Sequence, residues 1–273
     1  MSNPLSAPGP WSLVAQGYKK STQPVLAVYS EKVIELLGPS PGDSVLDVAT
    51  GPGTLAILIA GLVKDVAAID FSEQMIDELQ TSLRDRNITN IYPAVMDGQS
   101  LEFEANRFDI AISMFGLMFF PDKLKGMREI FRVLKPGGQV AISSWGPISE
   151  SSMMQLMFGA IRAAIPETPA PAQSIATLEN PDYFKEQLAL AGFSEIQVHP
   201  YAPPFTITDS TEFFNTMVEG SAPIQLIRSK MNKTTWDRKS QVMLDYIKSQ
   251  LSALPTQVSS QANLAIARKP PDR

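Results

Sequence analysis

The hydrophobic positions of the chain fall into short runs that alternate between two spacings. Between Pro24 and Gly38 the apolar residues recur at helical spacing, and Gly38-Pro39 ends the pattern. The next run, Ser44–Ala49, is short, β-rich and leads into glycines. The runs that follow predict helices at Thr54–Leu62, Ser72–Asp85 and Pro121–Leu134, and strands at Val66–Asp70, Asn90–Val95, Phe108–Ser113 and Gln139–Trp145. This alternation predicts an α/β fold in which a parallel sheet carries helices on both faces.

The alternation ends after Trp145. Ser151–Ile165 is apolar on most sides and is expected to be a lid helix, with the proline-rich segment Pro166–Pro171 as its hinge. The remaining expected elements are a helix at Pro181–Ala191, a strand at Glu195–Tyr201, helices from Asp209 to Leu251 and a final strand at Gln257–Ala267.

Composition narrows the class of protein. Apolar residues make up 44% and charged residues 19% of the 273 residues, as in a folded globular protein. The net charge of -5 would repel phosphate backbones, so nucleic acid is not an expected partner. The longest apolar stretch, Ala56–Val63, is too short to span a membrane and no export signal is visible, so we expect a cytoplasmic protein. A chain with no Cys and one His cannot form a thiolate or multi-histidine metal site, and no metal is expected.

The strongest chemical signal is a strand that leads into Gly51-Pro52-Gly53 at the start of a helix. Glycine lets a ligand approach the backbone closely, and the free N–H groups of the helix start face the same crevice. Asp70 ends the second strand, where a carboxylate can accept both hydroxyls of a ribose. Phe71 and Met75 follow and can pack against an adenine ring. These residues predict a site for an adenosine-containing cofactor.

The glycine loop alone leaves the type of cofactor open, because Gly51–Ala56 also fits the dinucleotide pattern G-x-G-x-x-A. Asp47 lies within the strand, four residues before Gly51, where it would repel a pyrophosphate and attract a cationic group. The chain also lacks a Tyr-x-x-x-Lys pair. Both observations disfavour a nicotinamide-dependent oxidoreductase, which stays as an alternative.

These segments resemble the class I S-adenosylmethionine-dependent methyltransferases, in particular the small-molecule branch that includes the quinone-ring methyltransferases. The resemblance extends from about Tyr18 to Trp145, and Asn263–Arg268 is similar to the final strand of the family. Asp47–Gly53 resembles the first motif, with Ala49 where many members carry Gly. The other similar segments, in order, are Asp70–Ser72 with Met75, Met96–Gly98 with Leu101–Phe103, Phe108–Ser113 through Asp122, and Arg132–Gly138.

The resemblance implies a role for each of three carboxylates. Asp47 would face the ammonium of the methionine moiety, Asp70 would hold the ribose hydroxyls and Asp97 the adenine amine. The N-terminal helix would cover the methionine end with Trp11 and Tyr18. The residues expected to bind S-adenosylmethionine are Tyr18, Asp47, Ala49, Gly51, Pro52, Gly53, Asp70, Phe71, Met75, Asp97, Gly98 and Ser113.

The implied architecture is a Rossmann-like doubly wound sheet of the class I methyltransferase type. It would have an N-terminal helical cover at residues 1–40 and an S-adenosylmethionine-binding core at 41–150. Residues 151–273 would supply the lid helix, the remaining strands and a helical insertion before the last strand, which runs antiparallel in the family. All three parts are expected to form one compact domain.

Apolar residues after the fourth strand predict where the methyl acceptor binds, because ligands of such sheets lie at the strand ends. Candidate acceptor contacts are Trp11, Met114, Phe115, Met118 and, on the lid helix, Met154. Ordinary core packing is the alternative for the loop and the lid helix. His199 shares its strand face with Gln197, opposite Ile196 and Val198, so we assign it a structural role and name no catalytic residue.

The expected function is transfer of a methyl group from S-adenosylmethionine to a small, hydrophobic or aromatic acceptor, with oxygen as the first choice of acceptor atom and a ring carbon as the second. A second alternative is a methyltransferase-like protein that binds the cofactor without transferring methyl.

Overall fold

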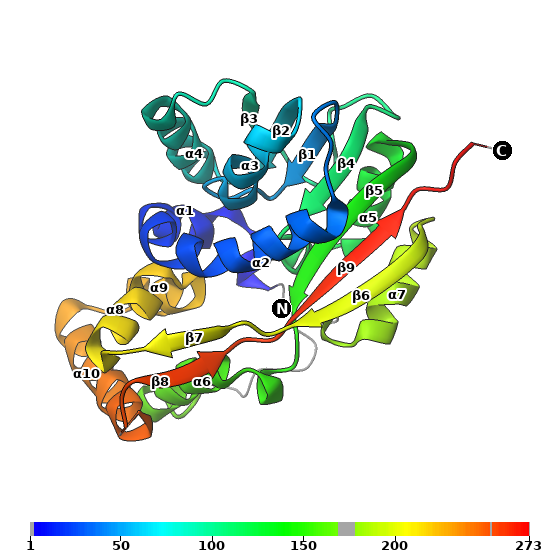
Figure 1. The fold of residues 1–273 in the computed structure, drawn as a ribbon. Helices are drawn as coiled ribbons and strands as arrows, with labels where there is room; N and C mark the ends of the chain where they lie inside the picture. The colour runs from blue at the N-terminus through cyan, green and yellow to red at the C-terminus, as the bar shows by residue number, and fades with distance from the viewer. Residues whose placement is uncertain (1–2, 169–177, 252, 273) are drawn as a thin grey trace.

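The computed structural model describes residues 3–168, 178–251 and 253–272. A seven-stranded sheet in the order β3-β2-β1-β4-β5-β9-β6 forms its centre (Figure 1). Its strands are β1 (Ser44–Val48), β2 (Asp65–Asp70), β3 (Ile91–Val95), β4 (Phe108–Ser113), β5 (Leu134–Trp145), β6 (Ser194–Tyr201) and β9 (Ala262–Arg268). The first five pair in parallel, whereas β9 runs antiparallel to both β5 and β6. The predicted fold class, including the reversed last strand, is therefore confirmed.

Helices cover both faces of this sheet. The flanking helices are α2 (Gln23–Leu37), α3 (Thr54–Ile59), α4 (Glu73–Arg86), α5 (Lys123–Val133) and α7 (Pro181–Leu190). In Figure 1, α2 crosses in front of the sheet beside α3, while α5 and α7 lie behind it. Local signals set their ends: Gly38 closes α2 in the left-handed conformation, and the Ser72 side chain caps the first turn of α4.

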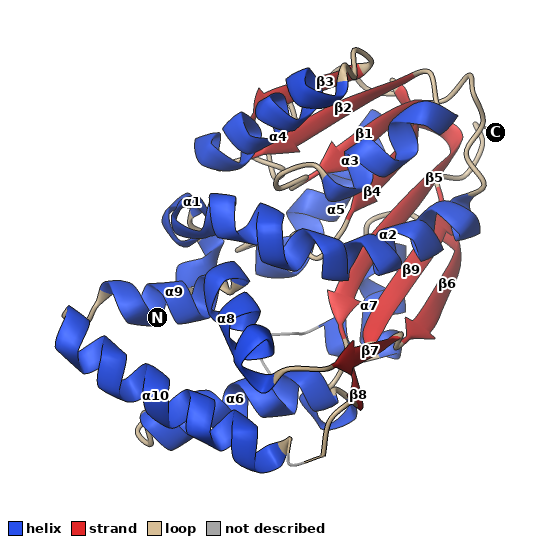
Figure 2. Cartoon of the chain, turned by 60° about the vertical axis from the view of Figure 1, so that its left-hand side comes forward, coloured by secondary structure: helices blue, strands red, loops and turns tan. Residues whose placement is uncertain are grey.

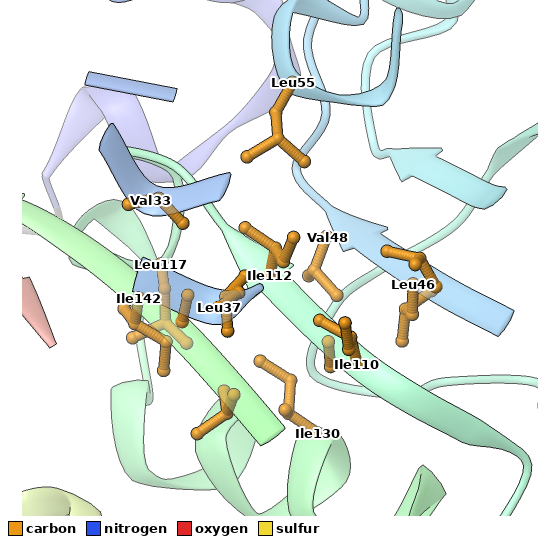
Figure 3. Packing of buried hydrophobic residues seen from close by; sticks show 14 of the residues in the cluster. Val33, Leu37, Leu46, Val48, Leu55, Ile110, Ile112, Leu117, Ile130 and Ile142 are labelled. Atoms are coloured by element: carbon orange, nitrogen blue, oxygen red, sulfur yellow. The ribbon is translucent and has the colours of Figure 1, made fainter. Parts of the chain in front are cut away.

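The main core lies between the sheet and these helices. Because β1 and β4 are covered on both faces, most of their buried residues are apolar, and Asp47 is the one buried charged residue of β1. Figure 3 shows this packing, with side chains from β1 (Leu46, Val48), β4 (Ile110, Ile112), β5 (Ile142), α2 (Val33, Leu37), α3 (Leu55) and α5 (Ile130). The core thus holds the carboxyl ends of β1 and β4 in fixed register.

A second apolar core lies in a helical layer beside the sheet (Figure 2). The layer consists of α6 (Ser152–Ala164), α8 (Ser210–Gly220), α9 (Ala222–Ser229), α10 (Lys233–Gln250) and the antiparallel pair β7 (Pro204–Ile207) and β8 (Thr256–Ser259). The expected lid helix is α6, and most of its apolar side chains pack in this core, where α6 meets α10 and β8. The expected hinge lies partly outside the described residues.

One expected strand is divided in the structure. The segment predicted as a single final strand, Gln257–Ala267, forms β8 and β9, which belong to different sheets. The chain changes sheets at Ser260-Gln261, where the buried hydroxyl of Tyr29 donates a 2.6 Å hydrogen bond to the Ser260 carbonyl. The division was not visible in the sequence because both halves carry the same strand-like pattern. The pairing strand β7 was not predicted either.

The N-terminal residues form a helical cover. It comprises the short turn η1 (Pro4–Ser6), α1 (Pro8–Gly17) and the π-helical turn η2 (Tyr18–Thr22), which continues into α2. Val14 and Ala15 of α1 pack against Met75 of α4 and Ala222 of α9. Within the described ranges, no helix combines the length and apolar character needed to cross a membrane.

Candidate functional site

Two adjoining cavities lie where β1, β2 and β4 end beneath the N-terminal cover. They share Tyr18, Ala49, Gly51 and Met114. The first cavity is also lined by Leu5, Ser6, Trp11, Asp70, Phe71, Met75, Met96, Asp97, Gly98, Gln99, Phe115, Gly116, Phe119, Phe120 and Pro121. The second is also lined by Leu26, Ser30, Asp47, Thr50, Thr54 and Leu55. Carboxyl ends of parallel strands meet at one edge of the sheet, which is why these segments converge.

The loop after β1 turns sharply because three of its residues are left-handed. The φ angles are 57° at Ala49, 56° at Gly51 and 85° at Gly53. At Gly53 a Cβ would also collide with the buried side chain of Leu79 on α4, so both the conformation and the space require glycine. Ala49 carries a methyl group in the left-handed conformation, and Gly116 is the residue that makes room for it, since a Cβ there would strike that methyl.

Asp47 is almost completely buried at the end of β1 and lines the second cavity. Burial raises the pKa of its carboxyl group to about 7, and the nearby charge of Asp70 adds to the rise, while a 2.6 Å hydrogen bond from Thr50 opposes it. Among the described residues that line this cavity there is no Lys or Arg. A bound cation would therefore stabilise the ionised carboxylate.

Asp70, at the end of β2, lines the first cavity and also holds the glycine loop. Its Oδ2 accepts a 2.9 Å hydrogen bond from the Gly51 N–H, and its Oδ1 accepts one of 2.9 Å from the Ser72 N–H. Burial raises the pKa of Asp70 to about 6, and these two hydrogen bonds limit the rise. Each carboxylate oxygen keeps a lone pair for a further donor, such as a ribose hydroxyl.

Asp97 follows β3 and is held by Gln99. Its Oδ1 accepts a 2.9 Å hydrogen bond from the backbone N–H of Gln99, which leaves Oδ2 available to a ligand amine. The side-chain oxygen of Gln99 accepts a 3.0 Å hydrogen bond from the Asp122 N–H and so joins this loop to the loop after β4. Next to Asp97, a Cβ on Gly98 would collide with Phe120 and Val48, so this position also requires glycine.

The expected acceptor residues divide into two groups. Trp11, Met114 and Phe115 line the first cavity. Met118 is buried beneath the loop after β4, and Met154 lies on α6, so neither lines a cavity. Met118 is separated from the cavity because the chain forms the turn η4 (Leu117–Phe119) after β4, and this turn directs the Met118 side chain toward the core.

Three other expected residues shape the site without lining it. Pro52 and Gly53 form the turn into α3, and the buried hydroxyl of Ser113 accepts a hydrogen bond from the Leu117 N–H below the loop after β4. His199, on β6, pairs with Leu264 of β9 and lines neither cavity.

Sequence reasoning missed several lining residues. Leu5 and Ser6 reach the first cavity because the Ser6 hydroxyl donates a 2.7 Å hydrogen bond to the Phe119 carbonyl, a contact between distant segments with no sequence signal. Ser30 was detectable as a polar residue on the apolar stripe of α2, and Thr54 as the first residue of the helix after the glycine loop.

The sheet order with its reversed last strand, together with carboxylates at the ends of β1 and β2 and after β3, is that of a class I S-adenosylmethionine-dependent methyltransferase. The chain belongs to the ubiE/COQ5 methyltransferase family, whose model matches residues 25–162. This membership confirms the predicted class and, with it, S-adenosylmethionine as the cofactor of that class.

One curated relative is the ubiquinone/menaquinone biosynthesis C-methyltransferase UbiE of Shewanella oneidensis, which is 39% identical over 113 residues. The match covers 40% of this chain and 45% of the relative, so the chain spans about half the length of the curated relatives it matches.

Two solved structures share the fold. The YcgJ protein of Bacillus subtilis has a TM-score of 0.60 at 15% identity, over 89% of this chain and 98% of that one. The phosphoethanolamine N-methyltransferase 2 of Haemonchus contortus, solved with phosphomonomethylethanolamine and S-adenosylhomocysteine, has a TM-score of 0.57 at 23% identity, over 89% and 52%. At these identities the likeness concerns the fold alone.

Proposed function

We propose that the chain binds S-adenosylmethionine across the two cavities and transfers its methyl group to a small, apolar or aromatic acceptor. The observation that carries the proposal is the arrangement of three carboxylates along the cavities. Asp97 and Asp70 line the first cavity and would bind the adenine amine and the ribose hydroxyls. Asp47 lines the second and would bind the ammonium group. The order of the three groups matches the order of the cofactor's own parts.

The second cavity suits the amino-acid end for a further reason. Besides Asp47 it presents the hydroxyl-bearing side chains of Ser30, Thr50 and Thr54, and Thr54 begins α3. The Thr50 hydroxyl already donates to Asp47 and the Ser30 hydroxyl to the Leu26 carbonyl, so the Thr54 hydroxyl is the one of the three left to donate to a carboxylate, while Asp47 accepts from the ammonium. The pocket therefore offers partners for both charges of a zwitterion.

S-adenosylmethionine supplies a methyl group that is activated by its positively charged sulfur. The protein then has to position the acceptor in line behind that methyl group and exclude water, and positioning alone can lower a barrier by ~7–11 kcal/mol. The N-terminal cover supports both tasks. Ser12 and Ser72 share a 3.0 Å hydrogen bond between their hydroxyls, and Lys19 forms a 3.2 Å ion pair with Glu78, so both α1 and η2 are fastened to the start and middle of α4.

The acceptor is proposed to lie against Met114, Phe115 and Trp11, which give the first cavity an apolar side. The aspartates on the cavity walls are already assigned to the cofactor, so no side chain is assigned to remove a proton. An electron-rich aromatic acceptor fits this arrangement. It can react at an ionised oxygen, or at the ring carbon activated by that oxygen, in which case the proton of that carbon then leaves to solvent. The sequence alone ranks oxygen first; the name of the Shewanella relative favours the ring carbon.

Calorimetric titration with S-adenosylhomocysteine, NAD and NADPH tests the cofactor assignment. Binding of S-adenosylhomocysteine alone supports it, and binding of a dinucleotide alone would replace it with an oxidoreductase. A methyl-labelled cofactor incubated with hydroxylated aromatic acceptors tests the transfer, and mass spectrometry of the product distinguishes O-methyl from C-methyl. Cofactor binding without transfer to any of them would favour a cofactor-binding protein. The expected cytoplasmic location remains part of the proposal.

A further inference from the structure

The helical layer touches the N-terminal cover without reaching the cavities. No described residue of α6, α8, α9 or α10 lines either cavity. The carboxyl end of α8 nevertheless packs against η2, and the Thr22 hydroxyl donates a 3.1 Å hydrogen bond to the Gly220 carbonyl. Phe214 and Val218 hold α8 in the second core, so η2 packs against a helix whose position is fixed by that core.

This contact leaves no space for side chains. A Cβ on Gly17, the last residue of α1, would collide with the backbone carbonyl of Glu219, and one on Gly220 would collide with the hydroxyls of Ser21 and Thr22. Neither glycine has a left-handed φ, and glycine in a helix is less stable than alanine by ~0.5–1 kcal/mol, so backbone conformation and helix propensity do not explain glycine at these two positions. The close approach of α8 to the end of α1 and to η2 explains it. Gly9 of the same helix α1 has no neighbour within van der Waals reach.

The turn between the two contacts carries a cavity residue. η2 is π-helical, a rare geometry that occurs mostly at functional sites, and its first residue, Tyr18, lines both cavities. The ion pair of Lys19 with Glu78 also fastens η2 to α4. The position of Tyr18 is therefore set by contacts of η2 with both α4 and α8.

We infer that Gly17 and Gly220 are positioning residues, whose close contact between η2 and α8 places Tyr18 against the bound cofactor. The helical layer thereby controls cofactor affinity from outside the cavities. The inference rests on the proposed function, because it requires that the cavities bind S-adenosylmethionine. Its physical basis is that a methyl group at Gly17 must push η2 away from the fixed carbonyl of Glu219, and small displacements of a positioning group are costly.

A double-mutant cycle tests the inference. S-adenosylhomocysteine is titrated calorimetrically into the wild-type protein, Gly17→Ala, Tyr18→Ala and the combined variant, with Gly9→Ala as the matched control on the same helix. We expect Gly17→Ala to raise Kd by about tenfold and Gly9→Ala to leave it within about twofold. In the Tyr18→Ala background, Gly17→Ala is expected to have almost no further effect, because the group that it displaces is absent.

Each outcome has one reading. If the wild-type protein does not bind S-adenosylhomocysteine, the proposed function fails and the inference fails with it. If the wild-type protein binds but the two substitutions act additively, or Tyr18→Ala binds like the wild type, only the inference is overturned. If circular dichroism shows that Gly17→Ala does not fold, Thr22→Val replaces it in the cycle. Loss of the hydrogen bond to the Gly220 carbonyl should raise Kd about threefold, again only when Tyr18 is present. An equal effect with and without Tyr18 would overturn the inference.

Discussion

The hydroxyl of Thr50 donates a 2.6 Å hydrogen bond to Oδ2 of Asp47 at the buried end of β1. The bond stabilises a carboxylate that burial destabilises, and the pKa of Asp47 still rises to about 7. The ligand-free protein thus holds a carboxyl group that ionises close to neutral pH. Several measurable properties depend on this pair.

The stability of the ligand-free protein should fall as the pH rises. Between about pH 4 and 7 the native state binds more protons than the unfolded chain, because Asp47 titrates near 7 when folded and near ~3.9 when unfolded. Ionisation of Asp47 should lower the free energy of unfolding by ~2 kcal/mol between pH 5 and 7. Urea unfolding of the wild type and of Asp47→Asn at both pH values measures this. The decrease in the free energy of unfolding with pH should be smaller in Asp47→Asn, and Asp70 accounts for the part that remains. An equal decrease in both proteins would contradict the raised pKa of Asp47.

Affinity for S-adenosylhomocysteine should change in the opposite direction. The ammonium of the ligand requires an ionised Asp47, so Kd should fall by up to about tenfold per pH unit below about pH 7 and level off above it. Binding near pH 6 should release a proton, which calorimetry in buffers of different ionisation enthalpy detects. In Asp47→Asn the pH dependence should be largely lost, while binding of adenosine alone is retained.

Removal of the Thr50 hydroxyl should shift this pH profile. Thr50→Val keeps the shape of the side chain but removes the donor to Asp47. A hydrogen bond to a charged group contributes ~1.5–3 kcal/mol, which corresponds to roughly one to two pKa units. The midpoint of the affinity profile should therefore move up by about one pH unit. An unchanged midpoint would show that this hydrogen bond does not hold the carboxylate in solution.

Asp70 and Asp97 should affect different parts of the ligand. Asp70→Ala should weaken binding of both S-adenosylhomocysteine and adenosine by ~1–3 kcal/mol, since the ribose hydroxyls lose a charged acceptor. It should also destabilise the loop, because Gly51 and Ser72 lose their hydrogen-bond partner. Asp97→Ala should weaken adenosine binding but not inosine binding, because inosine lacks the amine that Asp97 accepts from. Calorimetry with the two nucleosides separates the roles.

Two glycines of the same loop should differ in their tolerance of alanine. Gly51 and Gly53 are both left-handed, but only at Gly53 would a Cβ meet Leu79. Gly51→Ala should cost ~1–2 kcal/mol of stability from conformation alone. Gly53→Ala should cost a further ~1–3 kcal/mol from overpacking against α4. Thermal unfolding of the two variants tests this, and equal losses would remove Leu79 from the explanation.

The three carboxylates that line the cavities were accessible to sequence reasoning because their positions are local. Asp47, Asp70 and Asp97 each lie within or just after an apolar strand, and parallel strands bring their ends to one edge whatever the rest of the chain does. The acceptor side was harder to predict. Met118 and Met154 carry the right chemistry, yet η4 turns Met118 into the main core, and Met154 lies on α6, which lines neither cavity.

The sequence by itself determined the order of strands and helices, the glycine turn and the three carboxylates, because spacing and residue type act over a few neighbouring residues. Only the tertiary structure decided which surface covers each apolar face. It placed α6 against α10, divided the final strand between two sheets and brought Gly220 against η2. Apolar spacing specifies that a face is buried but not against which partner, since the hydrophobic effect is non-directional and packing selects the partner through shape.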